Sequence, residues 1–251
     1  MKRSLSVYFA NFISFNLLGL AIFVPGVLLV FALFGAAFLE LMAYDPSSGG
    51  PPPDFSGLHA GLFGIAWLLM LSLQYLLIAV VVFGSLRYLQ GNKASFLACL
   101  MQGLRRLGPI VVIAVISTIL VSIGMFLVIV PGIIVALMIC VAIPVLMVED
   151  PGILASLSRS RQLTKGSRWR LLGLFLVAFV GAGVIALIVP LPFGLLVFVD
   201  VEIGTVIANI VAGMMQLFVT VFFAVLLGVA YHDLRVAKEG VSTAQIAAIF
   251  D

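Results

Sequence analysis

Seven basic side chains in two connectors are the residues whose type and spacing best suit a binding function. They are Arg105, Arg106, Arg159, Arg161, Lys165, Arg168 and Arg170. Each lies in a short polar stretch between long apolar runs, where lipid headgroups would lie, and Arg and Lys bind phosphate well. Glu149 and Asp150 are candidate partners within the chain. Such connectors commonly serve only topology and anchoring; the alternative is recognition of an anionic headgroup or of a protein partner on the cytoplasmic side.

Several uncharged polar residues interrupt the apolar runs, and three of them suggest a second kind of site. They are Gln74, Asn209 and Gln216. One hypothesis places them in a polar groove between helices. The other gives them ordinary hydrogen bonds between helices, which stabilise a membrane protein by about 0.6 kcal/mol per contact. The sequence leaves both open and favours the second.

The sequence has no recognisable set of catalytic or metal-binding residues. His59, His232, Cys99 and Cys140 fall at different depths along the chain, so they predict neither a metal site nor a disulfide. The apolar runs hold no charged residue away from their ends, which argues against a proton-driven pump. We therefore expect a protein that is not an enzyme and that needs no cofactor.

The composition places the chain in the membrane class. Apolar residues make up 64% of the 251 residues and charged residues only 9%, against about 25% charged residues in soluble domains. A water-facing surface cannot be built from this composition, so we expect one transmembrane domain over residues 1–251. The net charge of +3 is small, and its placement beside apolar runs favours lipid headgroups as partners over nucleic acid.

Six apolar runs are long enough to cross a bilayer, which takes about 20 helical residues. They are residues 8–42, 61–86, 109–130, 133–148, 171–189 and 203–231. The first run is too long for one straight span, and Pro25 near its middle makes it either a kinked span or a hairpin. The third and fourth runs form one uncharged stretch, which we expect to turn at Pro131–Gly132.

The connectors alternate between basic ones and ones without Lys or Arg. This positive-inside pattern predicts six spans with both termini cytoplasmic, and it places residues 44–59 and 190–202 outside. Residues 92–107 and 151–166 have the spacing of amphipathic helices at the inner headgroup level. The predicted fold class is an all-α integral membrane protein, a six-transmembrane-helix bundle with amphipathic interfacial helices on the cytoplasmic face.

A stretch in the middle of the chain carries a family resemblance. Its motifs are Val128–Ile134, Pro144–Asp150, Ala155–Leu157, Ser160 and Leu163–Thr164. From Lys93 to Arg170 the chain resembles the YciC-like family of bacterial inner-membrane proteins, and it is similar to the membrane domain fused to some glycerophosphodiester phosphodiesterases. The resemblance implies six helices in a bacterial cytoplasmic membrane and no settled activity. The phosphodiesterase part of the fused proteins has no counterpart in this sequence.

Two functional hypotheses follow from these patterns. The leading one is a non-enzymatic inner-membrane protein that acts as a scaffold or as a factor in envelope maintenance. The alternative is a transporter or scramblase of lipids or other amphiphiles. Membrane lipids are the expected partners in both, through anionic headgroups, and the sequence leaves protein partners and a homo-oligomer open.

Overall fold

Helices make up all the regular structure in the described part of the chain. The computed structural model describes residues 1–43, 57–92, 95–198 and 200–240. Its elements are α1 (Lys2–Ala10), α2 (Phe12–Ala43), α3 (Gly57–Leu89), α4 (Phe96–Arg105), α5 (Leu107–Leu127), α6 (Ile129–Ile139), α7 (Ala142–Val148), α8 (Ile153–Thr164), α9 (Arg168–Ile188), α10 (Leu191–Gly194), the short 3₁₀ helix η2 (Leu195–Phe198) and α11 (Val201–Glu239).

Six helical segments of the described chain are long and apolar enough to cross a membrane. They are Phe12–Gly35, Gly61–Leu89, Leu107–Leu127, Ile129–Val148, Arg168–Gly194 and Val201–Glu239. The chain is thus a multi-span membrane protein, and the predicted all-α, six-helix fold class is confirmed. Most of the predicted outer loop, residues 44–56, lies outside the described residues.

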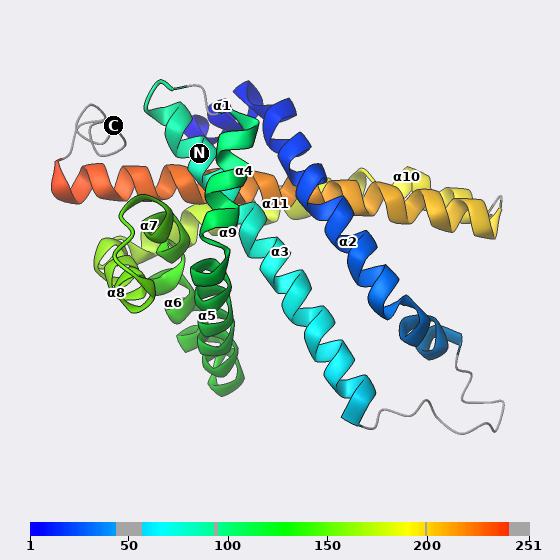
Figure 1. Ribbon diagram of the computed structural model, residues 1–251. Coiled ribbons are helices and arrows are strands. Elements are labelled where there is room, and N and C mark those ends of the chain that lie inside the picture. Colours follow the sequence, from blue (N-terminus) through cyan, green and yellow to red (C-terminus); the bar gives the residue numbers. More distant parts are fainter. Residues whose placement is uncertain (44–56, 93–94, 199, 241–251) are drawn as a thin grey trace.

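The membrane helices form three hairpins that share one end. Figure 1 shows the pairs α2–α3, α5–α6 and α9–α11 spreading away from the region where α1, α4, α7 and α8 gather. The last turns of α11 reach the same region, since Nη1 of Arg3 in α1 lies 3.1 Å from Oδ1 of Asp233 in α11. We call this region the basic end of the bundle. We call the separated tips of the three hairpins, one of them at the start of α11, the far end.

Helix α3 is the central element at the basic end. It packs against α2, α5 and α11, and Leu77, Val80 and Val81 are fully buried. Gly228 lets α11 approach α3 closely, because a Cβ atom there would lie 2.2 Å from Oγ of Ser85. Gly103 does the same for α4, with its Cβ position 2.4 Å from Cγ2 of Val80.

The first and last spans are each one continuous helix. Helix α2 runs through Pro25 without a break, so the hairpin alternative for residues 8–42 is excluded. A separate helix, α1, precedes it, and Asn11 joins the two. Helix α11 begins at Val201 and continues to Glu239, eight residues beyond the predicted end of the sixth span. Those last two turns carry charged side chains that pack at the basic end.

The third and fourth spans turn three residues earlier than expected. The backbone leaves the helix at Val128, which is extended with φ −160° and ψ 140°, and Pro131 lies in the first turn of α6. A proline is tolerated there because its missing N–H would have no partner in the helix. Gly132 makes contact with α5, since a Cβ atom at Gly132 would lie 2.6 Å from the backbone nitrogen of Met125. The glycine thus serves close packing and not the turn.

Both expected amphipathic helices form next to the basic connectors. Ser95 caps α4 by accepting a hydrogen bond from the backbone nitrogen of Ala98 at 3.2 Å. Cys99 faces the core, whereas Leu97 and Leu104 are exposed. In α8 the buried Ser160 donates from Oγ to the carbonyl of Met138 at 2.8 Å, close to the break between α6 and α7. This bond satisfies a carbonyl near the end of α6, where the helical ladder is interrupted.

Candidate functional site

A large groove opens between the hairpin α5–α6 and the hairpin α9–α11, next to α3. Its volume is about 870 Å³. On α9 the lining side chains Leu172, Phe175, Leu176 and Phe179 recur at the spacing of one helical face. On α11 they include Gln216, Thr220, Phe223 and Leu227, again on one face. Because the two helices are antiparallel, Phe179 and Gln216 lie at the end of the groove toward the middle of the bundle, and Leu172 and Leu227 lie toward the basic end.

The groove brings together two of the three polar residues singled out in the sequence. Gln74 of α3 and Gln216 of α11 both line it, whereas Asn209 is exposed nearer the far end and is not among the lining residues. Counting along the helices at about 1.5 Å per residue places both glutamines near mid-helix, with Gln216 about 22 Å from Val201 and from Tyr231. Within the described residues neither side-chain amide has a hydrogen-bond partner, so an apolar groove holds two unsatisfied polar groups.

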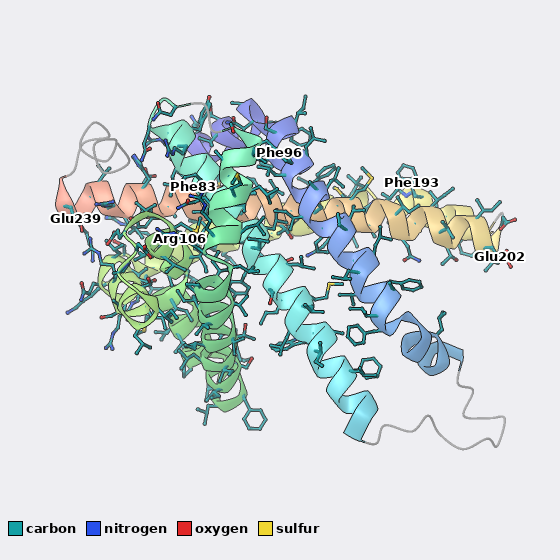
Figure 2. All side chains as sticks on the ribbon, in the orientation of Figure 1. Phe83, Phe96, Arg106, Phe193, Glu202 and Glu239 are labelled. Carbon is teal, nitrogen blue, oxygen red and sulfur yellow. The ribbon has the colours of Figure 1, made fainter. Side chains whose placement is uncertain are left out.

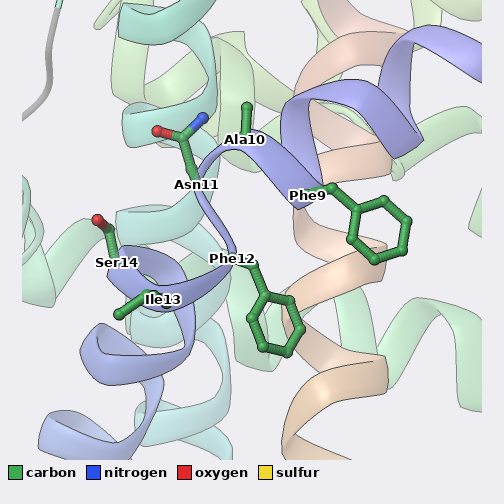
Figure 3. A pocket seen from close by; sticks show the side chains of 6 residues that line it. All are labelled: Phe9, Ala10, Asn11, Phe12, Ile13 and Ser14. Atoms are coloured by element: carbon green, nitrogen blue, oxygen red, sulfur yellow. The ribbon is translucent and has the colours of Figure 1, made fainter.

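A second hollow, of about 610 Å³, lies at the elbow between α1 and α2 (Figure 3). Six consecutive residues, from Phe9 to Ser14, line it. Figure 3 shows the rings of Phe9 and Phe12 on the side of the chain away from Asn11 and Ser14. Nδ2 of Asn11 donates to the carbonyl of Val7 at 3.1 Å, so this amide nitrogen already has a partner. A hollow made by one bend of the chain has no second element to hold a ligand, and we assign it no function.

Two of the seven predicted basic residues are held by acidic partners at the basic end. Nη1 of Arg106 lies 2.6 Å from Oδ1 of Asp150 and donates to the carbonyl of Leu146 at 2.7 Å. Nε of Arg159 lies 2.9 Å from Oε2 of Glu149. Glu149 and Asp150 thus pair with this set of basic residues, as the sequence suggested. Both arginines link elements within the fold, so they are less available to lipid than the sequence alone implied.

The ion pair of Arg159 belongs to a larger network that the sequence analysis missed. Arg159 also binds Glu239, whose Oε2 accepts from Nε of Arg235 at 3.0 Å. The hydroxyl of Tyr231 donates to Oε1 of Glu149 at 2.8 Å. Figure 2 shows Glu239 at the opposite end of α11 from Glu202. The network ties α7, α8 and α11 together at the basic end.

A sequence signal for this network did exist. Tyr231, Arg235 and Glu239 recur every four residues on α11, so they share one helical face. Burial lowers the pKa of Arg159, but hydrogen bonds and the charges of Glu149 and Glu239 raise it more, so the net direction is upward. Arg159 therefore remains charged and paired at neutral pH.

The other five predicted basic residues have no ion-pair partner among the described residues. Arg105, Arg161, Lys165 and Arg170 are exposed. Arg168 is half-buried, and its Nε is covered by protein without a hydrogen-bond partner. Trp169 beside it is 84% exposed, as expected of an aromatic side chain at the edge of the bilayer. These five residues are the part of the basic set that is free to meet headgroups.

The described residues contain no group of His, Cys, Asp and Glu side chains that could hold a metal ion. Cys99 is buried, and burial raises the pKa of its thiol to about 11. A thiol in this environment is a poor nucleophile at neutral pH.

The groove and the unpaired basic residues together are suited to binding an amphiphile. The apolar groove would hold its chains, and the charged surface beside it would face its headgroup.

Comparison with known proteins adds no family assignment. No protein-family model matches the chain, and no solved structure matches it. The resemblance of residues 93–170 to the YciC-like family therefore stays a prediction.

Proposed function

We propose that this chain is a non-enzymatic protein of the bacterial cytoplasmic membrane that binds lipids or similar amphiphiles in the groove and helps them cross the bilayer. Both termini would face the cytoplasm, with the basic end on that side. The proposal favours the transporter or scramblase hypothesis over the scaffold.

One observation carries the proposal: Gln74 and Gln216 share an apolar groove near mid-helix and lack partners there. An amide without a hydrogen-bond partner in the hydrocarbon region costs free energy, because no bulk water is present there to supply the missing hydrogen bonds. An occupant with polar groups, such as the glycerol and ester region of a lipid in transit, would satisfy both amides. A groove walled by Phe179 and Phe223 would accept the acyl chains at the same time.

The experiment is lipid movement in liposomes that contain the purified protein. Fluorescent phospholipid in the inner leaflet becomes accessible to an added quencher only when it crosses the bilayer. We expect faster quenching than in protein-free liposomes, and Gln216→Trp, which fills the groove, should slow it several-fold. Met214→Trp is the matched control, because Met214 is on the same helix, exposed and outside the groove lining.

Two outcomes would contradict the proposal. Movement equal to that in protein-free liposomes would remove it. Equal slowing by Gln216→Trp and Met214→Trp would show that the groove is not the path.

The scaffold remains the second candidate because α9 is so weakly covered by the rest of the chain. Val180, Leu187 and Ile188 of this helix are among many exposed apolar side chains. A partner helix could cover this face as well as lipid does. Cross-linking from α9 to a specific protein in intact cells, together with no lipid movement in liposomes, would favour the scaffold.

A further inference from the structure

Toward the basic end, the face of α9 that lines the groove carries one charged residue. Leu172, Phe175 and Phe179 line the groove, and Arg168 precedes them by one turn on the same face. With 100° per residue, positions 168, 172, 175 and 179 fall within about 60° of one another. Arg170 points to nearly the opposite side of the helix.

Arg168 also differs from the other unpaired basic residues in its surroundings. It is half-buried, and its Nε is covered by protein yet has no hydrogen-bond partner among the described residues. Three acidic residues of the basic end pair with other arginines, Glu149 and Glu239 with Arg159, and Asp150 with Arg106. The two Nη groups of Arg168 also lack a partner among the described residues, and unlike Nε they are not fully covered by protein. They can therefore donate charge-assisted hydrogen bonds to an external anion.

The length of this face matches one leaflet of a bilayer. From Arg168 to Phe179 the helix rises about 16 Å, close to half of the roughly 30 Å hydrocarbon thickness. Trp169, exposed beside Arg168, lies where aromatic residues collect at the membrane edge. A phospholipid with its phosphate at Arg168 would therefore lay an acyl chain along Phe175 and Phe179 and reach Gln216 with its tail.

We infer that Arg168 binds the phosphate of a glycerophospholipid whose acyl chain occupies the α9 wall of the groove, with anionic phospholipids preferred. This inference rests on the proposed function, since it names the substrate class of that groove. The phosphate chemistry itself would also fit free inorganic phosphate, and the experiment separates the two sources.

The test is binding to the full chain in detergent, measured by native mass spectrometry. Three probes are compared: phosphatidylglycerol, diacylglycerol with the same acyl chains, and inorganic phosphate. We expect phosphatidylglycerol to bind more tightly than diacylglycerol. Arg168→Gln should weaken phosphatidylglycerol binding about tenfold, as loss of a charge-assisted contact does, and leave diacylglycerol binding unchanged. Arg170→Gln, on the other side of the helix, is the matched control and should weaken phosphatidylglycerol binding far less.

Two further measurements separate a loss of the charge from a loss of the fold. Arg168→Lys keeps the charge and should retain most of the binding, and thermal unfolding of each variant checks its fold. Equal weakening by Arg168→Gln and Arg170→Gln, or no weakening by Arg168→Gln, would overturn the inference. Inorganic phosphate that binds as tightly as phosphatidylglycerol would also overturn it, because the acyl chain would then contribute nothing.

The inference and the proposed function can fail separately. Arg168-dependent binding of phosphatidylglycerol without lipid movement in liposomes would remove transport and keep the phosphate site. Lipid movement that Gln216→Trp slows but Arg168→Gln does not alter, together with unaltered phosphatidylglycerol binding, would keep the groove and remove the phosphate site.

Discussion

The two ends of the bundle are held together in different ways. At the basic end, Leu77, Val80 and Val225 are fully buried, and the Glu149–Arg159–Glu239 network joins α7, α8 and α11. At the far end, large apolar side chains stay uncovered, with Phe126 at 92% and Phe198 at 88% exposure. The fold is thus tied at one end and spread at the other, as Figure 1 shows.

The difference follows from the solvent at each depth. Near the headgroups water is present, so burying apolar surface and pairing charges both stabilise the fold at the basic end. Within the hydrocarbon, lipid tails cover an apolar helix as well as another helix does, and association depends on close packing and hydrogen bonds. Three hairpins can therefore separate toward the far end at little cost, which leaves a groove between two of them.

The largest test of this comparison uses two glycines of the same helix. Gly228→Leu would place a side chain against Ser85, whose Oγ lies 2.2 Å from the Cβ position, whereas nothing lies within 4 Å of the Cβ position of Gly213. We expect Gly228→Leu to destabilise the fold by about 3 kcal/mol through overpacking. Gly213→Leu should be neutral or slightly stabilising, since leucine favours helix more than glycine does.

The measurement is the midpoint of thermal unfolding in detergent, followed by size-exclusion chromatography. A similar loss of stability in both variants would show that the far half of α11 is packed as tightly as the basic half. The comparison between the two ends would then fail.

A smaller effect is expected from the charge network. Glu149→Gln keeps the shape but removes the charge that faces Nε of Arg159 and the hydroxyl of Tyr231. The side chains of Glu149 and Arg159 are 18% and 30% exposed, so water screens part of the pairing. We expect a loss of about 1–2 kcal/mol, toward the low end of charged hydrogen bonds.

The matched control is Glu202→Gln, at the start of α11, which has no ion pair within the described part of the chain. Its free energy of unfolding should stay within about 0.5 kcal/mol of that of the unaltered protein, as for an ordinary surface change. An equal effect of the two substitutions on chemical unfolding in mixed micelles would mean that the network contributes nothing specific.

The sequence predicted the features that depend on local residue patterns. It missed the features that depend on contacts between residues far apart in the sequence. Apolar run length identified the six helices, and the spacing of residues 92–107 identified the amphipathic helix α4. The turn was placed at Pro131 because proline usually ends a helix, yet Pro131 starts α6 and Val128 makes the turn.

The candidate site shows the same limit. Gln74 and Gln216 stand out as polar residues in apolar runs, but their meeting depends on how α3 and α11 cross, which no local pattern encodes. Glu149 and Tyr231 are 82 positions apart, so their hydrogen bond could not be read from spacing. Whether the groove and the free basic residues bind lipid stays a prediction.

The smallest expected effect concerns Cys99, whose reactivity reports how well the packing between α3 and α4 excludes water. Burial raises the pKa of its thiol from 9.0 to about 11. Between these values the unfolded chain loses the proton while the folded chain keeps it, so the free energy of unfolding should fall as pH rises through this window.

The alkylation test compares two variants that each carry one cysteine. Cys140→Ala leaves only Cys99, whereas Cys140→Ala with Cys99→Ala and Ser158→Cys leaves only a thiol at position 158, which is exposed on α8. At pH 7.5, N-ethylmaleimide should alkylate Cys99 far more slowly than it alkylates the thiol at position 158. Comparable rates for the two thiols would mean that the basic end opens readily, and the contrast between a tied end and a spread end would lose its physical basis.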